Sequence, residues 1–405
     1  MRRRDLYPPG TKSPLTQYPG GAPGGIAQFS EVIEASDGAT IDGGYIVPAT
    51  LPVNAVGKSV YPYDYIRVNT LLNVVHDAGR RTAWIDKQLG HIWVAGPGGA
   101  GCDDCFFPSQ DFFPGSKTNV TTSNTYEQSK MTALLNQIKG CDRTGSKAVG
   151  VPAFFGATFQ IVSAMQKYGL GGGYNTSFST PTPLTAAAFR YMDGYMGKLM
   201  TALEQAGLRD STAIVVCAKY GNAPVNPTTL RKIKINWSGL VANITGNPNG
   251  LVFIENDDVA LLWLNGTRLG RVVGQALATT YFNLIGAQQV LYGKALRKMG
   301  FNDPLMGDNR VPDVIIKTIP GVIYTGSSTK ISEHGGFSQQ DRSVALLVYH
   351  PSIGRKVTTS VHVSARSVAP SILKLLGLNP NRLTSSEVPG ILPGLAGFFD
   401  LKTSA

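Results

Sequence analysis

Apolar residues recur along the chain in two patterns, one with the spacing of helices and one in short continuous runs. The helical spacing predicts helices over residues 68–79, 184–207, 269–285, 287–299 and 368–376. The short runs predict strands over residues 82–86, 153–162, 213–217, 259–264, 314–319 and 344–349. Apolar strands that alternate with helices are typical of a mostly parallel sheet covered on both faces. The pattern therefore predicts the α/β fold class, with chemistry at the carboxyl ends of the strands.

The same pattern divides the chain into three parts. Residues 1–60 are rich in glycine and proline and show neither period, which predicts an irregular arm. Residues 61–395 are expected to form one domain with inserted loops near 95–150 and 220–255, and residues 396–405 a tail. Because a 60-residue structureless start is unusual in a compact domain, we expect a further segment upstream of it.

Composition places the chain among globular proteins. It has 405 residues, of which 42% are hydrophobic and 16% charged, enough for a substantial core. No apolar run reaches the roughly 18–20 residues that a membrane-spanning helix needs, so no membrane span is expected. The basic start of the chain lacks the apolar stretch of a signal peptide. Five glycosylation sequons lean mildly toward secretion; they begin at Asn119, Asn175, Asn236, Asn243 and Asn265.

The formal net charge of +11 fits an anionic ligand such as a phosphate. The basic residues are scattered, however, and do not alternate with aromatic residues as in a nucleic-acid platform. No specific nucleic-acid binding is therefore expected.

The four cysteines are too few for a disulfide scaffold. Cys102 and Cys105 form a C-x-x-C pair without the second pair that a structural zinc site requires, which leaves one loop disulfide or none. Cys217 lies in an apolar run and is predicted to be a small buried side chain.

Two further motifs are weak by themselves. Residues 96–101 match G-x-G-x-x-G, but a proline lies inside the motif and no helix follows, so a surface loop is predicted. His334 lies on a glycine-flanked loop, His76 on a predicted helix, and the other histidines (His91, His350 and His362) have no acidic or histidine partner at ligand spacing. These residues alone do not define a metal site.

Six segments resemble, in the same order, the type I phosphodiesterase/nucleotide pyrophosphatase family of the alkaline-phosphatase-like superfamily. They span residues 61–104, 151–167, 213–227, 257–264, 312–351 and 367–394. The resemblance implies an alkaline-phosphatase-like fold and hydrolysis of phosphodiester or pyrophosphate bonds. It further implies a Ser or Thr nucleophile and two divalent metal ions, for which zinc is well suited. It also implies a phosphate ester or nucleotide as ligand and an extracellular location for the full-length family form.

Matched residue by residue, this chain departs from the family at several positions. The family's first strand, its aspartate and its nucleophile would precede residues 6–10, which implies an N-terminally truncated or divergent member. Thr158 stands near the position of a metal-binding aspartate, and Lys219 and Tyr220 replace an aspartate and a histidine. Only His334 keeps a metal-ligand position. An ammonium beside this site would repel a metal ion, and Lys219 is instead expected to attract a phosphate.

Two hypotheses therefore stand side by side. The first is a hydrolase whose N-terminal catalytic strand lies outside this chain. The second is a catalytically inactive binding protein that retains the fold. A sulfatase is excluded, because none of the four cysteines lies in a Cys/Ser-x-Pro-x-Arg context.

Overall fold

A computed structural model describes most of the predicted domain. It covers residues 51, 57–66, 68–110, 113–167, 171–177, 179–266, 268–299, 311–353, 363–385, 390 and 392. Nearly all of the predicted arm and the whole predicted tail lie outside these residues. No helix in the described part of the chain combines the length and the apolar character that crossing a membrane requires.

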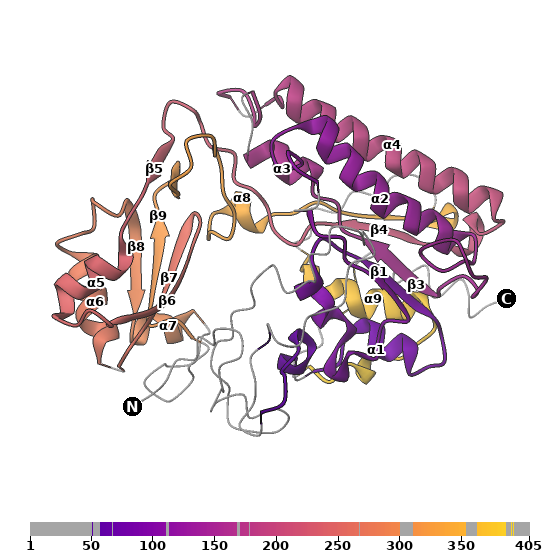
Figure 1. Cartoon of the computed structure of the whole chain (residues 1–405), viewed down its shortest axis with the longest axis horizontal. Helices are drawn as coiled ribbons and strands as arrows, with labels where there is room; N and C mark the ends of the chain where they lie inside the picture. Colours follow the sequence, from indigo (N-terminus) through magenta and orange to yellow (C-terminus); the bar gives the residue numbers. More distant parts are fainter. Residues whose placement is uncertain are drawn as a thin grey trace.

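A three-stranded parallel sheet of order β2-β1-β3 forms the centre of the larger lobe (Figure 1). Helices α2 and α4 pack on one face of it through a core that includes Ile85, Leu134 and Leu203. On the other side, α1 and α9 pack together around Val75 and Leu373, with Phe154 of β3 against them. The elements are β1 (Thr82–Ile85), β2 (Asp104–Phe106), β3 (Phe154–Ala157), α1 (Leu71–His76), α2 (Val120–Ile138), α4 (Pro183–Gln205) and α9 (Val368–Leu375). The predicted α/β class, with parallel strands and helices, is confirmed.

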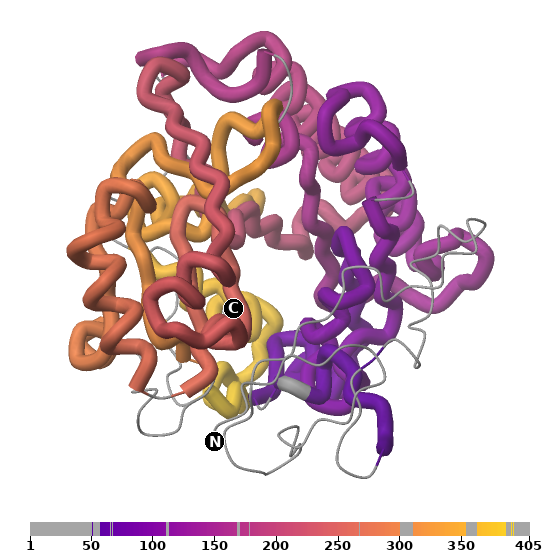
Figure 2. The backbone as a smooth tube through the Cα atoms, turned by 60° about the vertical axis from the view of Figure 1, so that its left-hand side comes forward, coloured from indigo at the N-terminus to yellow at the C-terminus, as the bar shows by residue number. Residues whose placement is uncertain are grey.

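Two helices far apart in the sequence, α1 and α9, lie side by side in this lobe. Figure 2 shows the C-terminal helix α9 in yellow beside the N-terminal segment that contains α1, in indigo. The helix predicted over 68–79 is realised by α1, and Gly79 follows it with a φ of 71°. The helix predicted over 184–207 is realised by α4, with Gly207 at a φ of 67°.

A second sheet is antiparallel, which differs from the predicted parallel pairing of 259–264 and 314–319. Its order is β6-β7-β9-β8, and α5 and α6 pack on it around Leu262, Val273 and Leu277. Only Asp257 and Asp258 separate β6 from β7, and a two-residue turn joins antiparallel neighbours whereas parallel strands need a long crossover. The elements are β6 (Leu251–Asn256), β7 (Val259–Leu264), β8 (Ala287–Tyr292), β9 (Val314–Thr318), α5 (Trp237–Thr245) and α6 (Leu269–Ala278).

The described structure also contains two separate strand pairs, three short α-helices and several short 3-10 helices. β5 (Arg231–Ile233) pairs in parallel with β10 (Val322–Tyr324), and β4 (Ile214–Cys217) pairs antiparallel with β11 (Leu346–Tyr349). The short helices are α3 (Ile161–Lys167), α7 (Lys294–Lys298) and α8 (Gln339–Arg342). Cys217 is exposed, so its predicted burial is wrong. Among the described strands β4 has β11 as its single partner, which leaves this apolar run on the surface.

Three further predictions need correction. Residues 95–150 contain the 19-residue helix α2, whose apolar spacing is obscured because Glu127, Lys130 and Gln137 are buried with it. Residues 220–255 contain β5, α5 and β6 rather than a plain loop. The helix predicted over 287–299 is instead β8 followed by α7, because 287–292 pair with β9 and Gly293 breaks the chain at a φ of 54°. Strand pairing overrides the local helical spacing there.

Candidate functional site

The three residues singled out by the sequence, Lys219, Tyr220 and His334, lie together at the end of β4. The ring centroids of Tyr220 and His334 are 4.1 Å apart, and the Nζ atom of Lys219 lies 5.0 Å from the Tyr220 ring centroid. The backbone of Asn222 forms an antiparallel bridge with that of His334. Gly221 allows the segment after β4 to pass close to α8, because a Cβ atom at this position would lie 2.0 Å from the carbonyl oxygen of Gln340.

Carboxylates lie beside both nitrogens of His334. Asp257 Oδ2 is 3.6 Å from Nδ1, and Glu333 Oε2 is 4.0 Å from Nε2. One ligand atom from each of these three residues lies within 4.8 Å of the other two. Burial and the nearby Glu333 carboxylate raise the pKa of Asp257 to about 7. These oxygen and nitrogen donors lie close enough together to be a candidate cation site.

The positive charges of lysines from four different segments act on the same imidazole. Burial, together with the positive charges of four lysines, lowers the pKa of His334 to about 3; these are Lys167, Lys219, Lys87 and Lys330. Lys330 also forms an ion pair with Glu333. His334 is therefore neutral at physiological pH, and positive charge converges next to its ring. We call these four residues the lysine cluster.

A second carboxylate pair lies next to this group. Asp258 and Asp341 are 9% and 5% exposed, and burial together with the Asp341 carboxylate raises the pKa of Asp258 to about 8. Asp341 accepts hydrogen bonds from the Ala223 amide at 3.1 Å and from the Ser338 hydroxyl at 2.6 Å. Through these bonds, Asp341 ties the segment after β4 to helix α8.

Asp86 directly follows β1 and lies at the centre of a second group of polar side chains, separate from the one around His334. Its Oδ1 atom accepts a hydrogen bond from the Thr158 hydroxyl at 2.5 Å and lies 3.0 Å from His91 Nδ1. Burial raises the pKa of Asp86, but the hydrogen bonds from His91, Thr158 and the Lys87 amide outweigh it and hold the pKa at about 2. His91 thus has an acidic partner that sequence spacing did not reveal. Thr158 donates to a carboxylate, which is a different task from the metal-binding aspartate it replaces.

A buried ion pair fixes the neighbouring backbone. Lys130 and Glu127 are both fully buried and lie 2.6 Å apart, and Lys130 donates to the carbonyl oxygen of Thr158 at 2.7 Å. Glu127 accepts hydrogen bonds from the amides of Gln160 and Ile161, where α3 begins. Since α3 ends at Lys167, this pair also positions one member of the lysine cluster.

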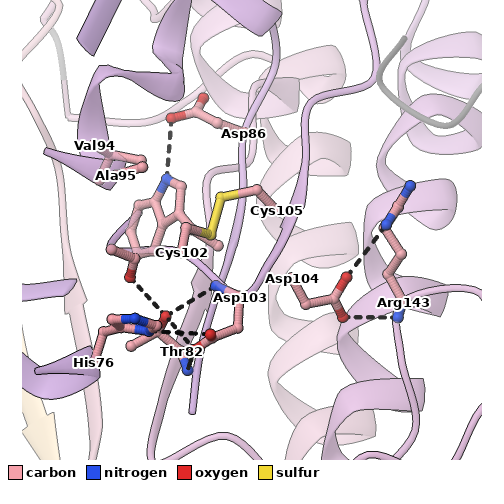
Figure 3. Close-up of a disulfide and its surroundings, with 12 residues drawn as sticks. His76, Thr82, Asp86, Val94, Ala95, Cys102, Asp103, Asp104, Cys105 and Arg143 are labelled. Carbon is pink, nitrogen blue, oxygen red and sulfur yellow. Dashed lines mark hydrogen bonds and ion pairs between the residues drawn. A yellow bond between two sulfur atoms is a disulfide. The ribbon is translucent and has the colours of Figure 1, made fainter. Parts of the chain in front are cut away.

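The C-x-x-C pair forms a disulfide in the larger lobe (Figure 3). Asp103, between the two cysteines, contacts His76 at 3.0 Å and the Thr82 hydroxyl at 3.1 Å. The preceding glycine-rich segment forms short turns over Pro97–Gly99, and a short strand follows the disulfide in place of a phosphate-binding helix. This agrees with the predicted surface loop.

Other expected positions lie outside the cluster. The segment after Ile319 leads into β10, which pairs in parallel with β5, and His350 is buried and accepts a hydrogen bond from the amide of Ser352. His362 lies outside the described residues. Sequence reasoning missed Asp257, Glu333 and Lys167 as members of the site. The available signals were a paired aspartate before an apolar strand and a glutamate next to His334.

Comparison with known proteins identifies the family of the chain. The sequence profile of the family described as type I phosphodiesterase/nucleotide pyrophosphatase matches residues 112–340. No curated protein sequence matches the chain.

Solved structures show a similar fold. Human ectonucleotide pyrophosphatase/phosphodiesterase 5 superposes with a TM-score of 0.53 at 12% identity, covering 85% of this chain and 78% of that one. An inactive variant of the murine protein in complex with AMP gives 0.49 at 13% identity, covering 82% and 74%. Phosphonoacetate hydrolase from Sinorhizobium meliloti gives 0.48 at 15% identity, covering 80% and 77%. At such identities the likeness to the human structure shows the fold alone.

Proposed function

The chain belongs to the type I phosphodiesterase/nucleotide pyrophosphatase family, and on that premise we propose that it binds phosphate esters at the lysine cluster beside His334. The observation that carries the proposal is that the positive charges of four lysines act on one neutral imidazole. They come from the segments after β1 and β4, from the end of α3 and from the segment before Glu333, and Lys219 Nζ lies 5.0 Å from the Tyr220 ring next to this imidazole. Ammonium groups that converge on one point form a site for a phosphate anion. Lysine charge would here replace part of the neutralisation that metal ions supply in the family.

The residues fit one of the family's two divalent cations. Asp257, Glu333 and His334 offer the oxygen and nitrogen donors that zinc accepts, and a cation would relieve the crowding that raises the pKa of Asp257. The positions of Lys219 and Tyr220 do not fit the second cation, because they carry an ammonium and a phenol. When bound, the first cation would supply charge that neutralises phosphoryl oxygens.

Hydrolysis of phosphodiester or pyrophosphate bonds is the second candidate function. The donor group of Asp257, Glu333 and His334 favours it, because the family's hydrolysis depends on metal ions held by such side chains. The disulfide between Cys102 and Cys105 supports an oxidising, extracellular location, which the family also favours.

Binding can be tested by calorimetry with inorganic phosphate and AMP as probes. Lys219→Gln is expected to weaken both affinities about tenfold, because it removes one charge-assisted contact. Lys139→Gln, on an exposed lysine at the end of α2, is the matched control and should leave both affinities unchanged. Equal affinities for the two variants and the parent protein would rule out the lysine cluster as the phosphate site.

Cation binding and turnover need a separate experiment. Zinc binding, followed by equilibrium dialysis, is expected to be lost in His334→Ala and Asp257→Asn and kept in His350→Ala. Zinc-dependent hydrolysis of bis(4-nitrophenyl) phosphate that disappears in His334→Ala would establish the second candidate. Zinc binding without any hydrolysis would leave phosphate-ester binding as the only supported function.

A further inference from the structure

Two similar pairs of an aspartate and a histidine lie at the two ends of strand β1. At its carboxyl end, Asp86 Oδ1 is 3.0 Å from His91 Nδ1. At its amino end, Asp103 Oδ1 is 3.0 Å from His76 Nδ1, and Asp103 accepts the amide of Thr82, the first residue of the strand. Figure 3 shows Asp86 and His76 at opposite ends of β1, and the strand from Thr82 to Asp86 spans roughly 13 Å at about 3.3 Å per residue. Only the Asp86–His91 pair therefore lies at the carboxyl end, where ligands bind to parallel sheets.

The contact with Asp86 decides which nitrogen of His91 faces outward. Burial raises the pKa of Asp86, but its hydrogen bonds outweigh this and hold the pKa at about 2, so the carboxyl is ionised at neutral pH. A carboxylate only accepts hydrogen bonds, which places the hydrogen of a neutral ring on Nδ1 and leaves Nε2 as an acceptor. The His91 side chain is 21% exposed, and among the residues that the structure describes Asp86 is its single polar partner. Nε2 is thus open to a water molecule.

Packing and hydrogen bonds hold the pair in place. His91 lies in the short 3-10 helix Leu89–Ala95, whose first residue is buried in one apolar cluster with Phe107. Asp86 accepts a hydrogen bond from the Thr158 hydroxyl at 2.5 Å, at the end of the neighbouring strand β3. A base that is oriented before the ligand arrives needs no rearrangement during the reaction.

Lys87 connects this pair to the proposed phosphate site. Its amide donates at 2.7 Å to Asp86 Oδ1, the same oxygen that contacts His91. Its positive charge acts on His334 and on Lys167. A phosphate held at the lysine cluster therefore adjoins the loop that carries the His91 ring.

The other described histidines are engaged elsewhere. His334 lies beside two carboxylates in the candidate cation site, and burial and the lysine charges lower its pKa to about 3, which makes it a weak base. His350 is buried, and its Nδ1 atom accepts the amide of Ser352. His76 lies at the far end of β1.

We propose that His91 is the general base of phosphate-ester hydrolysis at this site and that Asp86 is the residue that positions its ring. The inference rests on the second candidate function and deepens it, because it names the group that takes the proton. His91 Nε2 accepts a proton from water, the oxygen of that water bonds to phosphorus, and the ester P–O bond breaks with its electron pair on the leaving oxygen. A 4-nitrophenyl group leaves as the phenolate, and the proton passes from His91 to solvent.

Hydrolysis of bis(4-nitrophenyl) phosphate in the presence of zinc tests the proposal. His91→Gln is expected to lower kcat about 100-fold and to leave KM within about twofold, because a general base acts in the chemical step. Asp86→Asn should lower kcat about 10–100-fold, because the ring loses its orientation. His76→Gln, in the pair at the other end of β1, is the matched control and should change neither constant. Imidazole in the buffer should restore part of the activity of His91→Ala and none of that of Asp86→Asn, since a small base replaces a missing base but does not repair misplacement.

The outcomes separate this inference from the proposed function. A kcat of His91→Gln equal to that of the parent would overturn the inference alone, and His91→Asn serves if the first variant unfolds in a thermal melt. Loss of zinc binding by His91→Gln in equilibrium dialysis would make His91 a metal ligand and overturn its role as a base. Absence of hydrolysis by the parent protein would overturn the inference together with the second candidate function. Calorimetry with inorganic phosphate tests the lysine cluster independently, and His91→Gln should leave that affinity unchanged.

Discussion

Strands β1 and β4 are both short, mostly apolar runs, but their surroundings are very different. Both are followed by residues of the candidate site, Lys87 after β1 and Lys219 after β4. In β1, Ala83 and Ile85 are 0% exposed, because β2 and β3 flank the strand and helices cover the sheet. In β4, Val216 is 38% exposed, and Leu347, opposite it on β11, is 63% exposed.

The difference shows that an apolar run specifies a strand but not what covers it. Val216 and Leu347 are a directly opposed pair, and Tyr349 lies on the same face two residues further. We call these three residues the β4–β11 patch. Exposed contiguous apolar surface marks a site of association. Stability should therefore depend on β1 and its surroundings, and solubility on the β4–β11 patch.

Shortening one side chain of β1 and one of the β4–β11 pair should give the largest difference in the free energy of unfolding. Ile85→Ala is expected to lower the free energy of unfolding by about 2–5 kcal/mol, because it leaves a cavity in a closed core. Leu347→Ala should change it by no more than about 0.5 kcal/mol, because the side chain is already exposed. Urea unfolding followed by circular dichroism measures both. Equal losses would mean that the β4–β11 patch is covered in solution.

Substitution of Asp86, which follows β1, should also lower the free energy of unfolding more than substitution of Lys219, which follows β4. Asp86→Asn is expected to lower the free energy of unfolding by about 2 kcal/mol at pH 7, from a native pKa of about 2 against an ordinary value of 3.8. A carboxyl whose folded pKa is lowered stabilises the protein above its unfolded pKa. The contribution should disappear as pH falls from about 4 to about 2.

Lys219→Gln, after β4, is the matched variant for Asp86→Asn. Its free energy of unfolding should stay within about 0.5 kcal/mol of the parent at every pH, because Lys219 is exposed. A difference between Asp86→Asn and the parent that persists at pH 2 would contradict the assigned pKa.

Reduction of the disulfide next to β1 should lower the free energy of unfolding by a smaller amount. The Cys102–Cys105 bond closes a loop of a few residues next to β2, so its removal is expected to cost about 1–2 kcal/mol. Unfolding with and without a reductant measures this cost. The double variant Cys102→Ser/Cys105→Ser should be insensitive to the reductant, and a sensitive double variant would point to another thiol pair.

The smallest change in stability is expected for a substitution in the β4–β11 patch that changes solubility. Leu347→Thr is expected to leave the free energy of unfolding within about 0.5 kcal/mol and to reduce self-association in light scattering. Leu284→Thr, on another exposed leucine outside the patch, is the control and should not reduce association as strongly. If both substitutions act alike, the patch has no special role.

The site was only partly predictable from the sequence. Lys219, Tyr220 and His334 could be singled out because they match, or replace, positions of a family pattern. Lys167 and Asp257 could not, because a lysine at the end of a short helix and an aspartate in a tight turn look like ordinary surface residues. Their importance arises from His334, which lies far from both in the chain: the charge of Lys167 acts on its imidazole, and Asp257 lies 3.6 Å from its Nδ1 atom.

The sequence by itself determined the α/β class, the strands β1, β7, β9 and the helices α1, α4 and α9, because apolar spacing and glycine ends act over a few neighbouring residues. Tertiary structure decided how the strands pair, which runs stay exposed, and which charges meet. Residues 287–292 form a strand because β9 offers backbone partners. The polar residues Glu127, Lys130 and Gln137 are buried on α2 because each finds a partner there, Glu127 and Lys130 in each other and Gln137 in Asp104. Pairing, burial and charge depend on segments that only the folded chain brings together.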